Sequence, residues 1–243
     1  YMLAATPSIY KTGVLKAFKL GGHSAFNGAS TDGGAGIKYV NDNGFAFASN
    51  FVSKGSKTNA GIFTKEAKGK WDTQVAYTKP SYHVSLTYSD QQNGWNSYSY
   101  YATSDAATKA ATADSTAYML RAYWRPENAG TATPEISAGY DVLDITGNGD
   151  NVKEADSYFV GLGWDDMFTA DDKIGLAFGQ PLKATKYGAS GSSDVDPFLW
   201  EAYYSYKVND AVTVQPAVFG GSDVRSDTKD DMFGAALTTY FKF

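Results

Sequence analysis

The sequence predicts an all-β protein, an antiparallel transmembrane β-barrel with about 11 or 12 strands in this chain. Residues 232–243 alternate apolar and polar side chains up to an aromatic terminus, as in a strand with one lipid-facing and one lumen-facing side. Similar alternation recurs along the chain in segments of about ten residues, the length of a tilted membrane-spanning strand. The connections between these segments are alternately short and long, which is typical of an up-and-down barrel.

The composition agrees with such a barrel. The chain has 243 residues with 18 Tyr, 14 Phe and 25 Gly, so it is rich in girdle aromatics and turn residues. No run approaches the roughly 18 apolar residues of a spanning helix. The absence of Cys excludes a disulfide framework, and the net charge of −5 provides no basic surface for nucleic acid.

About eleven segments of period-two alternation are expected to form strands, each bounded by turn residues such as Gly, Asn, Asp or Pro. In chain order, the expected strands are 34–41, 44–53, 69–78, 81–89, 116–126, 134–143, 156–165, 173–182, 197–207, 211–221 and 231–243.

The connections fall into two groups. The short or compact ones are 41–44, 79–80, 126–134, 165–172 and 208–210. The long ones, rich in Ser, Thr, Asp, Lys and Gly, are 54–68, 90–115, 144–155, 183–196 and 222–230. In an outer-membrane barrel the short turns face the periplasm and the long loops face outward, so this alternation favours a barrel over a β-sandwich.

Alternation also assigns the two faces of the strands. Apolar and aromatic residues are expected to face lipid, with the aromatics near the strand ends at the level of the headgroups. The opposite face carries polar residues of mixed charge, which a water-filled lumen would solvate. The expected pore-lining residues are Lys38, Asp72, Gln74, His83, Arg121, Tyr123, Arg125, Asp141, Glu201, Tyr203, Lys207 and Gln215.

Residues 1–33 precede the expected barrel strands, which occupy 34–243. The pattern Val14, Lys16, Phe18 and Leu20 permits a first strand over 10–20, and the segment could instead fold inward as a constriction loop. An open sheet edge is not tolerated in lipid, so an odd number of strands requires completion. Either this segment or residues upstream of Tyr1 would supply the missing strands.

Segment 196–222 (DPFLWEAYYSYKVNDAVTVQPAVFGGS) combines a polar-aromatic strand, a short Val-Asn-Asp turn and a strand carrying Gln-Pro. It resembles the penultimate hairpin of the carbohydrate-selective, OprB-like porins. Segments 61–63 and 69–77, the C-terminal strand and the opening Pro-Ser-Ile-Tyr at 7–10 are similar to the cyanobacterial branch of that family, which includes iron-uptake porins.

The resemblance implies a homotrimeric porin in the outer membrane of a Gram-negative-type, cyanobacterial cell. Such a protein lies in lipid, uses no cofactor and lets small hydrophilic solutes or inorganic ions diffuse passively. Family members are longer and begin with a cell-wall-binding domain, so we expect this chain to be the C-terminal portion of a larger barrel of about 16 strands.

The resemblance also implies an inward loop within residues 1–30. The constriction candidates are Lys11, Lys16, Lys19 and His23. Segment 90–115 is the alternative constriction, but its Ala, Ser, Thr and Tyr suit an outer loop or a subunit contact better.

No constellation of residues predicts catalysis or a metal site. His23 and His83 are the only histidines, and no serine near either has the glycine pattern of a nucleophile elbow. The acidic loop 144–156 misses the spacing of a calcium-binding EF-hand loop. Trp95 and its neighbouring tyrosines could stack on sugar rings, although loop packing accounts for them more simply.

Three classes of function therefore remain: a passive diffusion porin, a barrel enzyme, and a secreted sugar-binding β-sandwich. The missing catalytic constellation disfavours the enzyme. The outward aromatics and the alternation of short and long connections disfavour the sandwich, which would purify without detergent. We expect a porin and not an enzyme.

Overall fold

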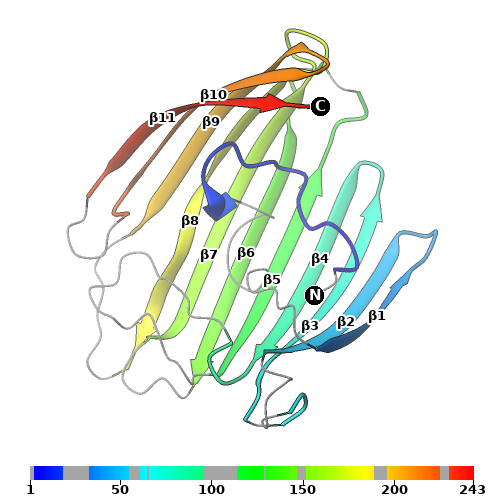
Figure 1. Cartoon of the computed structure of the whole chain (residues 1–243), viewed down its shortest axis with the longest axis vertical. Helices are drawn as coiled ribbons and strands as arrows, with labels where there is room; N and C mark the ends of the chain where they lie inside the picture. The colour runs from blue at the N-terminus through cyan, green and yellow to red at the C-terminus, as the bar shows by residue number, and fades with distance from the viewer. Residues whose placement is uncertain are drawn as a thin grey trace.

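The computed structural model describes residues 3–18, 33–54, 61–64, 66–95, 114–128, 130–146, 152–188, 196–224 and 230–243. Within them the chain forms one antiparallel sheet of eleven strands, each paired with the next strand in the chain (Figure 1). The strands are β1 (Gly34–Val40), β2 (Phe45–Lys54), β3 (Lys68–Lys79), β4 (Tyr82–Gln91), β5 (Asp114–Trp124), β6 (Glu135–Thr146), β7 (Val152–Asp165), β8 (Lys173–Tyr187), β9 (Phe198–Asn209), β10 (Val212–Ser222) and β11 (Met232–Phe241).

The eleven expected strands are confirmed, and most of their ends lie close to the expected positions. The largest differences are at the hairpin of β7 and β8, which begins at Val152 rather than 156 and continues to Tyr187 rather than 182. Backbone pairing continues here past the apolar alternation, through several register shifts. An ion pair between Glu154 and Lys186 (2.6 Å) lies on this polar extension, which hydrophobic periodicity could not reveal.

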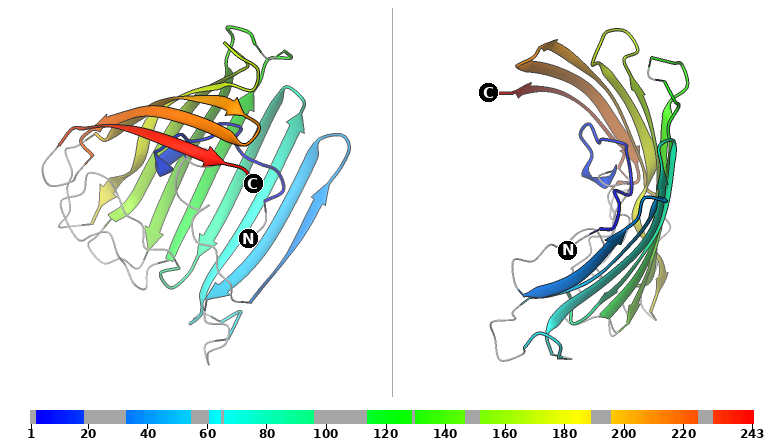
Figure 2. Two further views of the ribbon diagram at one scale, coloured as in Figure 1. Left: turned by 45° about the horizontal axis from the view of Figure 1, so that its top comes forward. Right: turned by 90° about the vertical axis from the view of Figure 1, so that its right-hand side faces the viewer.

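The sheet is a curved wall with residues 3–18 on its concave side (Figure 2, right). Its two edges, β1 and β11, do not pair with each other. The eleven strands therefore form an open arc, and the closed barrel expected from the sequence is not completed by them. All the described strands belong to this one sheet, whereas a sandwich requires two sheets packed face to face.

The convex face is apolar and exposed. Leu86 of β4 and Leu120 of β5, which are register partners, are each 50% exposed. Six strands place two aromatic residues six positions apart on this face, a separation of about 20 Å along a strand. The pairs are Phe45 and Phe51, Trp71 and Tyr77, Tyr82 and Tyr88, Tyr118 and Trp124, Tyr158 and Trp164, and Trp200 and Tyr206.

These aromatics line up across strands into two bands. Phe45 lies opposite Tyr77 and Tyr82 opposite Trp124 near the short turns, while Phe51 faces Trp71 and Tyr88 faces Tyr118 near the other end. Rings within a band contact one another, as in the pair Tyr88–Tyr118 with centroids 5.4 Å apart. Two aromatic bands flanking an aliphatic zone are typical of a surface that faces lipid.

The concave face is polar, and several of its charges are paired. Lys70 and Asp72 of β3 lie 3.1 Å apart with almost no exposure, and Arg121 of β5 pairs with Asp141 of β6. The sequence predicts that lumen water solvates Asp72, Arg121 and Asp141. Instead, neighbouring strands bring opposite charges together, which offsets the cost of burying them.

Among the described residues, no helix is long and apolar enough to cross a membrane.

Candidate functional site

Residues 3–18, termed here the inner segment, cross the concave face of the sheet (Figures 1 and 2). They contain no strand, and their one regular element is the short 3₁₀ helix η1 (Lys16–Phe18). A strand over 10–20, one of the two sequence-based alternatives, is thus not seen in its described part. The segment runs across the strands, so side chains from many strands can hold it.

The backbone of the inner segment is tied to side chains spread from β3 to β10. The Ala5 N–H donates to Oε1 of Gln74 on β3 (2.9 Å). The N–H groups of Ile9 and Tyr10 donate to Oγ of Ser137 on β6 at 3.3 and 3.2 Å. Tyr203 on β9 donates its hydroxyl to the Lys11 carbonyl (2.8 Å), and Gln215 on β10 donates to the Gly13 carbonyl (3.3 Å).

Glu201 on β9 makes the densest set of these contacts. Its carboxylate accepts hydrogen bonds from three successive backbone N–H groups, those of Gly13 (2.7 Å), Val14 (2.9 Å) and Leu15 (2.6 Å). The hydroxyls of Tyr10 (2.8 Å) and Thr12 (3.1 Å) donate to the same carboxylate. Successive N–H groups that converge on one anion form a nest, here closed around a side chain of the protein itself.

Apolar packing adds to these polar contacts. Phe18 (1% exposed) and Tyr10 (8%) pack with Phe159 and Tyr203 in a buried cluster on the concave face. At the other end of the inner segment, Ala4 is buried against alanines of β2 and β3. The inner segment is therefore docked as part of the folded protein.

Two glycines permit this close approach. A Cβ atom on Gly161 of β7 would lie 2.5 Å from the Tyr10 ring. One on Gly13 would lie equally close, 2.5 Å, to the Tyr203 ring. The absence of a side chain at these positions lets the inner segment lie flat against the sheet.

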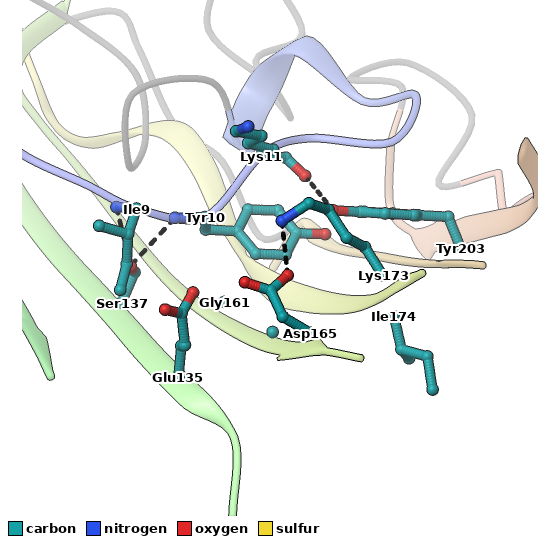
Figure 3. A pocket seen from close by; sticks show the side chains of 11 residues that line it. Ile9, Tyr10, Lys11, Glu135, Ser137, Gly161, Asp165, Lys173, Ile174 and Tyr203 are labelled. Atoms are coloured by element: carbon teal, nitrogen blue, oxygen red, sulfur yellow. Dashed lines mark hydrogen bonds and ion pairs between the residues drawn. The ribbon is translucent and has the colours of Figure 1, made fainter. Parts of the chain in front are cut away.

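A groove of about 570 Å³ opens between the inner segment and the ends of the strands nearest the short turns. It is lined by charged groups of both signs, and Figure 3 shows most of them around an adjoining small cavity. The charged residues of the groove are Lys11, Arg125, Glu135, Asp165 and Lys173.

Two ion pairs lie within this groove. Lys173 binds Asp165 at 2.5 Å, and Arg125 lies 3.9 Å from Glu135. Lys11 of the inner segment is the remaining cation, so the groove carries three cations and two carboxylates. Burial and the nearby Glu201 raise the pKa of Tyr10 well above its usual range, so its phenol stays protonated and can donate to Glu201.

The expected pore-lining residues divide by exposure. Those buried on the concave face are Asp72, Gln74, His83, Arg121, Asp141, Glu201, Tyr203 and Gln215. Tyr123, Arg125 and Lys207 are partly exposed and Lys38 on β1 is exposed. The structure therefore brings together Arg125 and Lys11, whereas several of the others pack beneath the inner segment or against one another.

The constriction candidates are only partly described. Lys11 is exposed on the inner segment and lines the groove, and Lys16 begins η1. Lys19 and His23 lie outside the described residues. Segment 90–115, the alternative constriction, is described only at its two ends.

The described residues show no cluster of three or more His, Cys, Asp or Glu side chains that could hold a metal ion. His83 is buried, hydrogen-bonded to Thr78 (2.7 Å) and Ser85 (2.9 Å), and stacked on Tyr123 with ring centroids 4.8 Å apart. Trp95 is 2% exposed beneath the Lys54 ammonium group, so its ring is packed and not open to a sugar.

The alternation of the strands predicts Glu201, Tyr203, Gln74 and Gln215 as pore-lining residues, but it does not predict that they anchor the inner segment. Tyr10, Thr12 and Gly13, which complete the anchor at Glu201, were not candidates. One available signal was the inward position of Glu201 on β9, next to Trp200 and two residues before Tyr203, since such a carboxylate needs partners. Its partners are about 190 residues away in sequence, and no local pattern links them.

No protein-family model matches the chain, and no curated protein matches it in sequence. Among solved structures, the chain is similar to the porin OmpF of Salmonella typhi, determined in complex with daunomycin. The TM-score is 0.57 at 15% sequence identity, over 86% of this chain and 61% of that one. The chain thus spans about three fifths of the length of this porin, and the likeness establishes a porin-like, antiparallel fold.

Proposed function

We propose that this chain is part of an outer-membrane porin through which small hydrophilic solutes or inorganic ions diffuse passively. No covalent chemistry is part of this proposal. The concave face lines the aqueous path, and the convex face contacts lipid. The inner segment narrows the path and places Lys11 beside Arg125 and Lys173.

One observation carries this proposal: the inner segment is docked across a polar concave face by contacts from β3 to β10. A soluble sandwich would fill this space with a second apolar sheet. A porin-sized barrel instead encloses an aqueous channel, which a segment folded inside it can narrow. The aromatic bands on the convex face support the same assignment, because they suit the two interfaces of a membrane.

The proposal includes a closed barrel. The backbone edges of β1 and β11 would be unsatisfied in lipid, so further strands must pair with them in a membrane. A total of about 16 strands would suit a porin with an aqueous channel. The sequence resemblance to the OprB-like porins of cyanobacteria supports a homotrimer of such barrels, with carbohydrates or ions as the solutes.

Conductance measurements in planar lipid bilayers test this function. The purified protein should need detergent and should produce stepwise, ohmic conductance increments in KCl solution. Liposomes that contain it should swell in isotonic solutions of small sugars but not of large dextrans. Water-soluble protein without detergent, or protein that inserts and does not conduct, would refute the proposal. The mass of the detergent-solubilised complex tests the trimer.

A further inference from the structure

The hydrogen bonds between Glu201 and the inner segment have a consequence for permeation. Glu201 is inward-facing but fully buried, and its carboxylate already accepts hydrogen bonds from five donors of residues 10–15. A carboxylate enclosed in this way is not available to a passing ion. Its influence on solutes must therefore act through the segment that it holds.

We propose that Glu201 is the positioning residue of the constriction: its carboxylate fixes the turn Thr12–Leu15 against β9 and thereby sets the position of Lys11 in the groove. This inference rests on the proposed porin function. It differs from a role for Glu201 as a lumen charge, because it predicts that the geometry of the inner segment controls the channel.

The contacts on either side of the turn support this role. Tyr203, two residues from Glu201 on the same face of β9, receives the turn on its ring and donates its hydroxyl to the Lys11 carbonyl (2.8 Å). Gln215 on the neighbouring strand β10 donates to the Gly13 carbonyl (3.3 Å). The backbone of residues 11–15 is thus held on its N–H side by Glu201 and on its carbonyl side by Tyr203 and Gln215.

The chemistry of the nest distinguishes a residue that holds the turn by accepting hydrogen bonds from one that only fills space. Three backbone N–H groups and two hydroxyls point at Glu201, so the site requires acceptor oxygens. Glu201→Gln preserves the volume of the side chain but replaces one oxygen with an NH₂ group, which would face donors. If Glu201 only filled space, Gln would be tolerated. If Glu201 holds the turn by accepting hydrogen bonds, Gln should release the turn. Glu201→Asp keeps the carboxylate and should restore part of the function.

The test compares the single-channel conductance of the complete closed barrel with those of its Glu201→Gln and Glu201→Asp variants. Release of the turn in Glu201→Gln should raise the conductance about twofold or more, because the lumen of a porin-sized barrel is wide without its internal segment. Glu201→Asp should lie between Glu201→Gln and the wild type. Tyr10→Phe, which removes one donor only, provides a milder variant if Glu201→Gln does not fold.

Proteolysis separates the position of the turn from the loss of charge. Lys11 directly precedes the turn and is exposed, so trypsin can cleave after it once the turn is released. Cleavage after Lys11 should be faster in Glu201→Gln than in the wild type, with Glu201→Asp between them.

Each result decides the inference. Wild-type conductance in Glu201→Gln would overturn it while leaving the porin function intact. A raised conductance without faster cleavage after Lys11 would also overturn it, since the effect would then come from charge. If neither the wild type nor any variant conducts, the porin function itself fails and this inference fails with it.

Discussion

Arg121 on β5 donates to both carboxylate oxygens of Asp141 on β6, and each side chain is only 1% exposed. The two residues are diagonal neighbours in the register, since Asp141 lies opposite Met119 and Arg121 opposite Gly139. Ser157 on β7 donates to the same carboxylate at 3.3 Å. This buried pair ties three consecutive strands together on the concave face.

Breaking that pair should destabilise the protein. Arg121→Ala leaves a buried carboxylate without its partner, at a cost of about 3–5 kcal/mol, while the double variant Arg121→Met with Asp141→Leu should be close to neutral. Equilibrium unfolding by denaturant in detergent micelles or liposomes measures the difference. A small effect of Arg121→Ala would mean that water reaches Asp141.

Ion selectivity should depend on Lys11 of the inner segment. Lys11→Glu changes the groove from three cations and two carboxylates to two cations and three carboxylates, so the reversal potential in a KCl gradient should move toward that of a cation-selective channel. Lys79→Glu is the matched control. It lies at the same end of the sheet, but its ammonium group stacks on Tyr77 of the convex face. Equal shifts in both variants would argue against a groove-specific effect.

The close approach of the inner segment to β7 should be sensitive to a single methyl group. Gly161→Ala places a Cβ atom 2.5 Å from the Tyr10 ring, whereas Gly163→Ala meets nothing nearer than a Glu135 oxygen at 3.7 Å. We expect Gly161→Ala to cost about 1–3 kcal/mol through overpacking and to speed trypsin cleavage after Lys11. Gly163→Ala should behave like the wild type in both assays.

Leu86 should lie near the middle of the membrane. It stands on β4 between the aromatic residues Tyr82 and Tyr88 and is 50% exposed. Leu86→Lys should therefore destabilise the protein in liposomes by about 2–4 kcal/mol, whereas Tyr82→Lys at the aromatic band should cost about 0–1 kcal/mol. If the convex face were exposed to water, both substitutions would be tolerated equally.

The backbone amides in the turn between β7 and β8 should lose protection from hydrogen exchange in acid. Desolvation raises the pKa of the Asp172 carboxyl. Hydrogen bonds from the N–H groups of Thr169, Phe168 and Met167 lower it by more, so the pKa lies below its usual value. The contribution of the ionised group is therefore present above about pH 4, the unfolded value, and is lost as the pH falls through the folded value.

Hydrogen-exchange protection factors of the amides of residues 167–169, measured at pH 5 and pH 2.5, test this titration. Protection should fall between the two pH values in the wild type. In Asp172→Asn it should already be weaker at pH 5 and should change little on acidification. Identical behaviour of the two proteins would show that Asp172 does not control the turn.

Local patterns in the sequence were sufficient to predict the strands and their faces. Alternation with period two depends only on neighbouring residues, so Leu86 or Trp71 could be assigned to the outer face without knowledge of any partner. The turns could be recognised as well, because Asn, Asp, Gly and Pro act locally. The limits of β7 and β8 were less accurate, since their polar ends pair without an apolar pattern.

Local patterns could not predict which inward residues contact one another or how residues 3–18 are held. The Arg121–Asp141 pair depends on the register between two strands, and the contacts of Glu201 join it to a segment without any periodicity, about 190 residues away. The partners of such contacts meet only after the chain has folded into a curved sheet. There the contacts offset the cost of burying charged groups on the concave face. The strands of the sheet could therefore be predicted from local sequence, whereas the position of the inner segment depends on contacts between residues far apart in sequence.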